Sequence, residues 1–307
     1  MNEVFYKGYW MITNRCNLSC SYCVLENAPH QKRLELDLQA KKDMISHLYH
    51  KLRFRRLTLS GGEVSIIGKR PPADFIELLN HLKQFRSTNP KDHLEVEIYS
   101  NGIYIDEKVV AAMAGVVDMV AMTIDSKDNN LLNEIGRKYK GLTSYYDHII
   151  KLSHLLAKEN IQFKLHSVIS QKNHLALPKE VKFIIDSIEK AKGKVDAWKF
   201  YQYMSYDAPE KDNAHAISPE VYQQFIEHTQ KALEEHTVPL HFKSNQEMNA
   251  SLFNILSYGN AQYMREGDTW STTQRTQHLG SYQSMEELFA KHDINEIAFR
   301  KFHQIQR

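Results

Sequence analysis

Apolar runs rich in Val, Ile, Tyr and Phe alternate along the chain with segments whose apolar residues recur at helical spacing. Six of these runs predict strands, because β-branched and aromatic residues favour extended backbone. They span residues 4–13, 57–60, 94–100, 116–125, 161–170 and 195–204. Strands that alternate with helices in this way predict an α/β fold with a parallel sheet wound by right-handed crossovers. Six repeats are too few to close an eight-stranded barrel, so we expect an open or partial barrel.

Three of the intervening segments show the periodicity of a helix with one buried face. In residues 180–191 the apolar side chains fall at positions i, i+3, i+4 and i+7. Residues 144–160 also carry an apolar stripe, and Ser144 is placed to cap their first turn. Residues 74–85 behave likewise. The predicted stripes are Val181, Ile184, Ile185 and Ile188 in the first helix, and Ile149, Leu152, Leu155 and Leu156 in the second.

The alternation weakens after residue 204. Residues 206–220 are polar and predict a loop, a helix is expected at roughly 219–236, and a less regular tail follows. We therefore expect a partial barrel over residues 1–204. Residues 205–307 would form a C-terminal extension that closes or caps the barrel and its active site.

The overall charge is nearly balanced, with 39 Lys and Arg against 37 Asp and Glu. Such a chain lacks the global positive charge of a nucleic-acid-binding protein, so any phosphate recognition must be local. The first 30 residues do not resemble a signal peptide, and no run approaches the roughly 20 apolar residues that span a bilayer. We expect a protein of the reducing cytoplasm that contacts neither a membrane nor nucleic acid directly.

All three cysteines lie within one short segment, "CNLSCSYC", as Cys16, Cys20 and Cys23. Three thiols cannot form a complete set of disulfides, and their crowding favours a metal site. A structural zinc ion would need a fourth ligand, such as a histidine. A [4Fe–4S] cluster normally takes four cysteines, so three would leave one iron open to a small molecule.

Polar residues follow the next three predicted strands. The second strand ends in "LSGGE", where adjacent glycines allow a close approach of the backbone to a ligand. The small polar groups that end the third and fourth strands suit ribose hydroxyls, although turn chemistry alone also explains them. These candidate residues are Ser60, Gly61, Gly62, Glu63, Ser100, Asn101, Asp125 and Ser126.

The Cys-x3-Cys-x2-Cys loop after the first strand and the Gly-Gly-Glu turn after the second resemble the radical S-adenosylmethionine (SAM) superfamily. This resemblance implies a partial (β/α)6 barrel, a [4Fe–4S] cluster on Cys16, Cys20 and Cys23, and SAM as a cosubstrate. The amine and carboxylate of SAM would bind the open iron, and the Gly-Gly-Glu turn would hold the amine. An electron-donating reductase or flavodoxin would then trigger release of a 5′-deoxyadenosyl radical.

Further segments resemble the viperins in order over about 200 residues of the chain. They are "LSGGE", "SNG", "DS" at 125–126, "IGR" at 135–137, "FKLHSVI" at 163–169, "WKFYQ" at 198–202 and "SNQEM" at 244–248. Arg137, Lys164 and Lys199 lie in these segments and together could neutralise a triphosphate, although Arg137 could instead bind the SAM carboxylate. Lys199 would point into the barrel if its aromatic neighbours pack outward.

Three departures from the viperin pattern bear on the chemistry. Val24-Leu25-Glu26 follows the third cysteine where viperins have Phe-His-Thr. His166 replaces an asparagine at a position expected to face the substrate. Leu252 occupies the place of a tyrosine proposed to return a hydrogen atom to the product radical, so Tyr258 or Tyr263 would have to substitute, or the product differs.

The resemblance implies a lyase or dehydratase that binds a ribonucleoside triphosphate. Abstraction of the 4′ hydrogen and loss of water would give a 3′-deoxy-3′,4′-didehydro nucleotide, a chain terminator suited to antiviral defence. No cysteine follows residue 23, which argues against an auxiliary cluster domain. Two alternatives stay open: radical chemistry on another small molecule or a protein partner, and a zinc-stabilised binding module without enzymatic activity.

Overall fold

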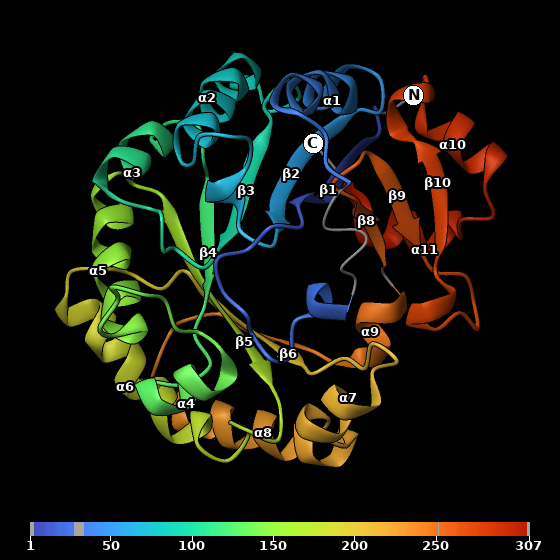
Figure 1. Ribbon diagram of the computed structural model, residues 1–307. Coiled ribbons are helices and arrows are strands. Elements are labelled where there is room, and N and C mark those ends of the chain that lie inside the picture. The colour runs from blue at the N-terminus through green and yellow to red at the C-terminus, as the bar shows by residue number, and fades with distance from the viewer. Residues whose placement is uncertain (1–2, 28–33, 251, 306–307) are drawn as a thin grey trace.

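Seven parallel strands, β1 to β7, form the centre of the fold and follow one another in chain order (Figure 1). The computed structural model describes residues 3–27, 34–250 and 252–305. Strands β1 to β6 coincide with the six predicted runs, which confirms the predicted α/β alternation. The strands are β1 (Phe5–Thr13), β2 (Phe54–Gly61), β3 (Glu95–Ser100), β4 (Met119–Thr123), β5 (Gln162–Ile169), β6 (Ala197–Gln202) and β7 (Leu240–Lys243).

Helices surround the sheet on its outer side, as Figure 1 shows in a view along the barrel. The predicted stripe of α6 is fully buried, and Ser144 caps α5 by accepting a hydrogen bond from the Asp147 backbone N–H. Burial of each such aliphatic side chain contributes about 1.5–3 kcal/mol, so the α6 stripe alone holds this helix firmly on the sheet. The α-helices in the six connections between β1 and β7 are α1 (Leu38–His50), α2 (Ala73–Leu82), α3 (Glu107–Met113), α4 (Asn129–Ile135), α5 (Tyr145–Lys158), α6 (Leu177–Lys190), α7 (Pro209–His215) and α8 (Pro219–Ala232).

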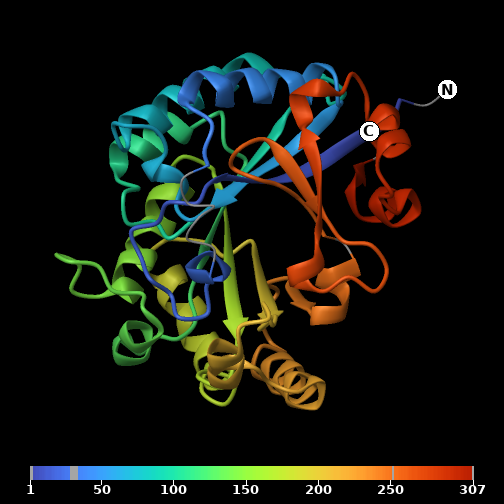
Figure 2. The same ribbon diagram turned by 45° about the vertical axis from the view of Figure 1, so that its right-hand side comes forward.

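The C-terminal region adds strands to both edges of this sheet. Strand β7 pairs with β6, whereas β8 pairs with β1 on the opposite edge and continues into antiparallel β9 and β10 (Figure 2). The sheet runs from β10 to β7 as an open sheet, which confirms the predicted partial barrel. The remaining strands and α-helices are β8 (Phe253–Ile255), β9 (Asn260–Tyr263), β10 (Gln274–His278), β11 (Gln304–Ile305), α9 (Asn245–Ala250), α10 (Met285–Lys291) and α11 (Glu296–His303).

Two expectations for this region need correction or remain open. The predicted loop at 206–220 contains helix α7, which begins at Pro209, a residue suited to the first helical position. The helix escaped notice because only His215 among its residues is buried, so it has no apolar stripe. The division at residue 205 stays a prediction, since strands from both parts share one sheet.

Within the described ranges, every helix is too short or too polar to cross a membrane.

Candidate active site

The cysteine loop follows β1 at the carboxyl end of the sheet. Cys16 is exposed, Cys20 and Cys23 are half-buried, and none of the three forms a disulfide bond among the described residues. Two backbone hydrogen bonds hold the loop in place. The Cys23 N–H donates to the Cys20 carbonyl at 2.9 Å, and the Ser21 N–H donates to the carbonyl of Ile135, the last residue of α4, at 2.7 Å. The thiols therefore project from a loop whose backbone is already fixed by β1 and α4.

The two glycines of the Gly-Gly-Glu turn bring β2 against the cysteine loop. A Cβ on Gly61 would lie 2.0 Å from the Thr13 carbonyl oxygen, and one on Gly62 would lie 2.1 Å from the Arg15 carbonyl oxygen. Gly61 also has a φ of +133°, which side chains rarely adopt. The close approach that the sequence predicts is thus an approach to the protein's own backbone, directly beside Cys16.

Glu63 joins the turn after β2 to the turn after β3. Its carboxylate is fully buried and accepts hydrogen bonds from the Ser65 N–H and hydroxyl, the Ser100 hydroxyl and the Asn101 N–H, at 2.6–3.0 Å. Burial raises the pKa of Glu63, while these four donors oppose the rise. The Asn101 side chain in turn donates to the Cys16 sulfur at 3.8 Å. Three predicted cofactor residues, Glu63, Ser100 and Asn101, thus meet beside the cysteine loop, and their role in binding stays a prediction.

Replacing Glu63 with glutamine should lower both the melting temperature and the affinity for SAM. The amide would turn an N–H2 group toward backbone and hydroxyl donors, and each buried group left unpaired costs about 1–3 kcal/mol. Thermal unfolding and equilibrium dialysis with SAM measure the two effects. Glu189→Gln on the exposed face of α6 is the matched control. Wild-type melting and SAM binding in Glu63→Gln would contradict this assignment.

Asp125, Arg137 and Tyr22 form a buried polar cluster behind Cys20. Arg137 Nε donates to Asp125 at 2.8 Å, the Tyr22 hydroxyl donates to the same carboxylate at 2.7 Å, and Arg137 also contacts Tyr22 directly. Burial disfavours the charge of Arg137, but Tyr22, Cys20 and Asp125 hold its pKa well above the usual value. Arg137 is therefore a fixed positive charge next to a cysteine thiol. The next residue, Ser126, donates to Glu180 of α6 at 2.8 Å and accepts from the Asp128 N–H at 3.0 Å, and its role in cofactor binding stays a prediction.

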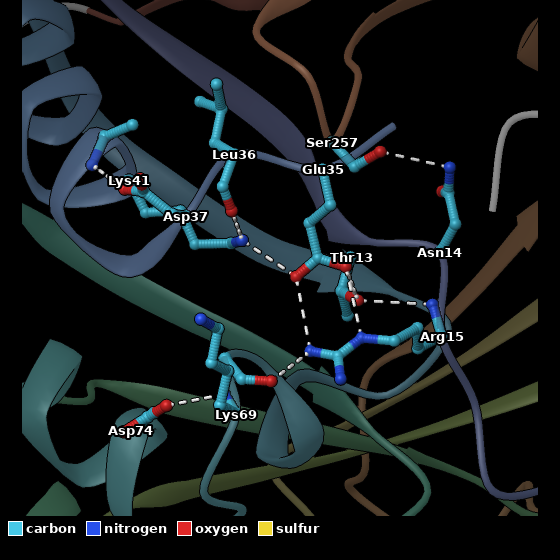
Figure 3. A network of polar contacts seen from close by, with 12 residues as sticks. Thr13, Asn14, Arg15, Glu35, Leu36, Asp37, Lys41, Lys69, Asp74 and Ser257 are labelled. Carbon is cyan, nitrogen blue, oxygen red and sulfur yellow. Dashed lines mark hydrogen bonds and ion pairs between the residues drawn. The ribbon is translucent and has the colours of Figure 1, made fainter. Parts of the chain in front are cut away.

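A second polar network supports the start of the cysteine loop (Figure 3). Glu35 accepts hydrogen bonds from Thr13 at 2.7 Å, Lys41 at 2.8 Å and Arg15 at 3.3 Å, and Arg15 also donates to the Gly68 carbonyl at 2.8 Å. Burial would raise the pKa of Glu35, but Lys41, Thr13 and Arg15 lower it, so the carboxylate stays ionised. The network ties the first residues of the loop to the beginning of α1 and to the segment after β2.

Inside the barrel, basic side chains from β1, β2, β5, β6 and β7 lie on the inner face of the sheet. Trp198 and Phe200 are fully buried, and Phe200 packs on Phe225 of α8, so strand alternation turns Lys199 to the inner face. Burial, Lys164 and Lys243 lower the pKa of Lys199 to about 8. Burial, Arg56 and Lys7 lower that of Lys164, although Glu97 opposes the shift. We call these residues the cation layer: Lys7, Arg56, Lys164, Lys199 and Lys243.

An aromatic layer lies one pleat closer to the cysteine loop. Tyr9, Tyr99, His166 and Tyr201 each follow a charged inward residue of their strand by two positions. The His166 ring lies 4.5 Å from the Tyr99 ring and 5.2 Å from the Tyr201 ring, measured between centroids. The Tyr9 hydroxyl lies 2.5 Å from the Ser60 hydroxyl, at the start of the Gly-Gly-Glu turn. The barrel interior thus runs from the cysteine loop through aromatic rings to a group of cations.

The sequence analysis missed Lys7, Arg56, Lys243 and the three tyrosines of this interior. The signal that could have revealed them is the alternation of side chains between the two faces of a strand. Each of these residues lies two positions from another polar or aromatic residue on its strand, so both side chains point to the same inner face.

The two tyrosines proposed as hydrogen donors lie in different places. Tyr258 packs against a small apolar cluster of Met11, Leu25 and Leu256, and Cys23 packs against the same cluster. Tyr263 lies in β9, where its hydroxyl donates to Asp293 at 2.8 Å, and the structure does not bring it to the cysteine loop. Leu252 directly precedes β8 and is half-buried.

Across the described part of the chain, no three His, Cys, Asp or Glu side chains form a group that could hold a single metal ion.

Comparison with known proteins gives a family model and several relatives. The model described as the radical SAM superfamily matches residues 10–169. An S-adenosylmethionine-dependent nucleotide dehydratase of Oncorhynchus mykiss is 27% identical over 263 residues, which cover 83% of this chain and 68% of that protein. An uncharacterized protein of Methanocaldococcus jannaschii is 28% identical over 176 residues, which cover 57% of this chain and 56% of that protein.

The fold is shared with solved structures at low identity. The structure of Streptococcus suis SuiB bound to S-adenosylmethionine matches this fold with a TM-score of 0.61 at 14% sequence identity. The matched region covers 83% of the present chain and 59% of the SuiB chain. The chain thus spans little more than half of two of the proteins it matches.

Proposed function

The chain belongs to the radical SAM superfamily, and from that premise we propose that this enzyme dehydrates a ribonucleoside triphosphate. The radical would abstract the 4′ hydrogen, the 3′ hydroxyl would leave as water, and one further electron and proton would complete a 3′-deoxy-3′,4′-didehydro nucleotide. The observation that carries this proposal is the cation layer, which lies in the same barrel interior as the residues beside the cysteine loop.

The residues at the mouth of the barrel fit a [4Fe–4S] cluster and SAM. Cys16, Cys20 and Cys23 would hold three irons, and the fourth would accept the amine and carboxylate of SAM. The Asn17 side-chain N–H2, adjacent to Cys16, is shielded from solvent and has no hydrogen-bond partner among the described residues, as expected beside an acceptor that the chain does not supply. When bound, these groups supply a 5′-deoxyadenosyl radical.

The chain's own residues would position the nucleotide and exclude water. Lys164 and Lys199 would bind the triphosphate, since an uncompensated buried ammonium group is costly without an anion. His166 and the tyrosines of the aromatic layer would contact the ribose or base between the phosphates and the radical. Tyr258, which packs against the same apolar cluster as Cys23, would return the hydrogen atom in place of the tyrosine that Leu252 replaces.

Two broader consequences belong to the same proposal. The electron would come from a reductase or a flavodoxin that approaches the exposed cysteine loop. A product without a 3′ hydroxyl would block chain extension by a polymerase, which suits a role in antiviral defence.

Incubation of the anaerobically reconstituted enzyme with SAM, dithionite and each of the four ribonucleoside triphosphates tests the proposal. We expect one triphosphate to stimulate formation of 5′-deoxyadenosine and to yield a nucleotide lighter by one water, as measured by mass spectrometry. The corresponding nucleoside without phosphates is the control and should not stimulate cleavage. If no triphosphate stimulates SAM cleavage, the proposal is wrong.

A further inference from the structure

The imidazole ring of His166 is buried inside the barrel among basic and aromatic side chains. Its side chain lies in β5 at 6% exposure, with its ring edge-on to the rings of Tyr99 and Tyr201. Its Nε2 atom is shielded from solvent and has no hydrogen-bond partner within the described residues. An imidazole that is buried with an unsatisfied nitrogen is a costly arrangement for a merely structural residue.

Two lysines face this ring from adjacent positions. Lys199 is the register partner of His166 on β6, and Lys164 precedes His166 by two residues on the same face of β5. Burial and the charges of these two lysines hold the pKa of His166 well below its usual value, so the free enzyme keeps the ring neutral at pH 7. The other charged and titratable groups around the layer are Lys7, Tyr9, Arg56, Glu95, Glu97, Tyr99, Tyr201, His241, Lys243 and Glu247, of which Glu95 pairs with Arg56 and Glu247 with Lys243.

We propose that His166 takes up a proton from solvent when a polyphosphate binds in the cation layer, and so becomes an additional cation for that ligand. The step transfers one proton from the buffer to the imidazole and involves no redox change. A polyphosphate brings negative charge next to Lys164 and Lys199, which removes the repulsion that keeps the ring neutral. The inference rests on the proposed triphosphate site.

Thermodynamic linkage between ligand binding and protonation of His166 fixes the direction in which affinity changes with pH. Because the anion favours the protonated ring, the pKa of His166 rises on binding, and affinity must increase as pH falls through the range between the free and bound values. The affinity can change by at most about tenfold for each pH unit. That maximum is reached when each bound ligand is accompanied by the uptake of one full proton. An asparagine at this position, as in the viperin pattern, would give no such dependence.

Isothermal titration of the full-length, cluster-loaded enzyme with inorganic tripolyphosphate tests this inference without catalysis. At pH 6.5, Lys199, whose pKa is about 8, is already almost fully protonated, so the groups of the layer that can respond are His166 and His241, and the His166→Asn variant separates them. Titration in two buffers of different ionisation enthalpy measures the protons taken up, and we expect a value between about one half and one per site. His166→Asn should still bind tripolyphosphate but take up almost no proton.

His228→Asn, an exposed substitution on α8, is the matched control and should keep the wild-type uptake. Equal heats in the two buffers for the wild-type enzyme would overturn the inference and leave the triphosphate function standing. Full uptake in His166→Asn would assign the proton to another group and would also overturn it. Absence of any tripolyphosphate binding, together with no stimulation of SAM cleavage by nucleotides, would remove the proposed function as well.

Discussion

Replacing Cys20 with alanine should abolish both iron binding and SAM cleavage while leaving the chain folded. The wild-type enzyme should contain about four irons after anaerobic reconstitution. Cys20 is one of only three thiols in the chain, so no other cysteine can take its place. The loop backbone should survive, because its hydrogen bonds come from main-chain groups such as the Ser21 N–H. Iron analysis, the absorbance of the cluster and production of 5′-deoxyadenosine measure the effect.

Ser21→Ala is the control for this substitution. Its side chain is adjacent to Cys20 in sequence, and the contact that fixes the loop is made by the Ser21 backbone, so iron content and SAM cleavage should stay at wild-type values. Circular dichroism should show the same helix content in both variants. A Cys20→Ala enzyme that keeps four irons and cleaves SAM would show that the cysteine loop is not the cluster site.

The parts of the fold that sequence could predict are those in which local pattern and final environment agree. Strand β6 is the clearest case, because alternation alone places Trp198 and Phe200 against the helices and Lys199 on the inner face. Helix α6 is similar, since its apolar stripe becomes its buried face. The cysteine and Gly-Gly-Glu motifs end β1 and β2, and parallel strands bring those ends together.

The parts that sequence could not predict depend on residues distant in the chain. Glu35 and Arg15 are 20 residues apart, and nothing local to either shows that they pair. The glycines of the Gly-Gly-Glu turn look suited to a ligand, but it is the Thr13 and Arg15 carbonyl oxygens that leave no room for a Cβ. The cation layer likewise forms only when five strands curve around a common interior.

Replacing Lys199 with methionine should weaken triphosphate binding about 10–100-fold. A charge-assisted hydrogen bond contributes about 1.5–3 kcal/mol, and methionine keeps the length of the side chain without the charge. Isothermal titration with tripolyphosphate at pH 7 measures the dissociation constant. Lys231→Met, on the exposed face of α8, is the control for the change in net charge and should bind as the wild type does.

Lys199→Met should also raise the stability of the free enzyme. Replacing a residue that only supports the fold would lower that stability instead. The pKa of Lys199 is about 8, below its ordinary value of 10.5. The protonated lysine therefore destabilises the folded state at pH 7, by at most about 3 kcal/mol, and this cost disappears as pH rises from 8 toward 10.5. Lys199→Met should melt at a higher temperature than wild type at pH 7 and show a smaller gain at pH 10.

Binding should follow the opposite trend with pH. In the wild-type enzyme an anion favours the charged lysine, so affinity for tripolyphosphate should fall as pH rises from 7 to 9, and Lys199→Met should lose this part of the dependence. The combination of higher stability and weaker binding is expected of a buried cation kept for an anionic ligand, because an empty anion site leaves like charges close together. A variant that melts lower than wild type and binds tripolyphosphate equally well would show that Lys199 serves the fold and not the substrate.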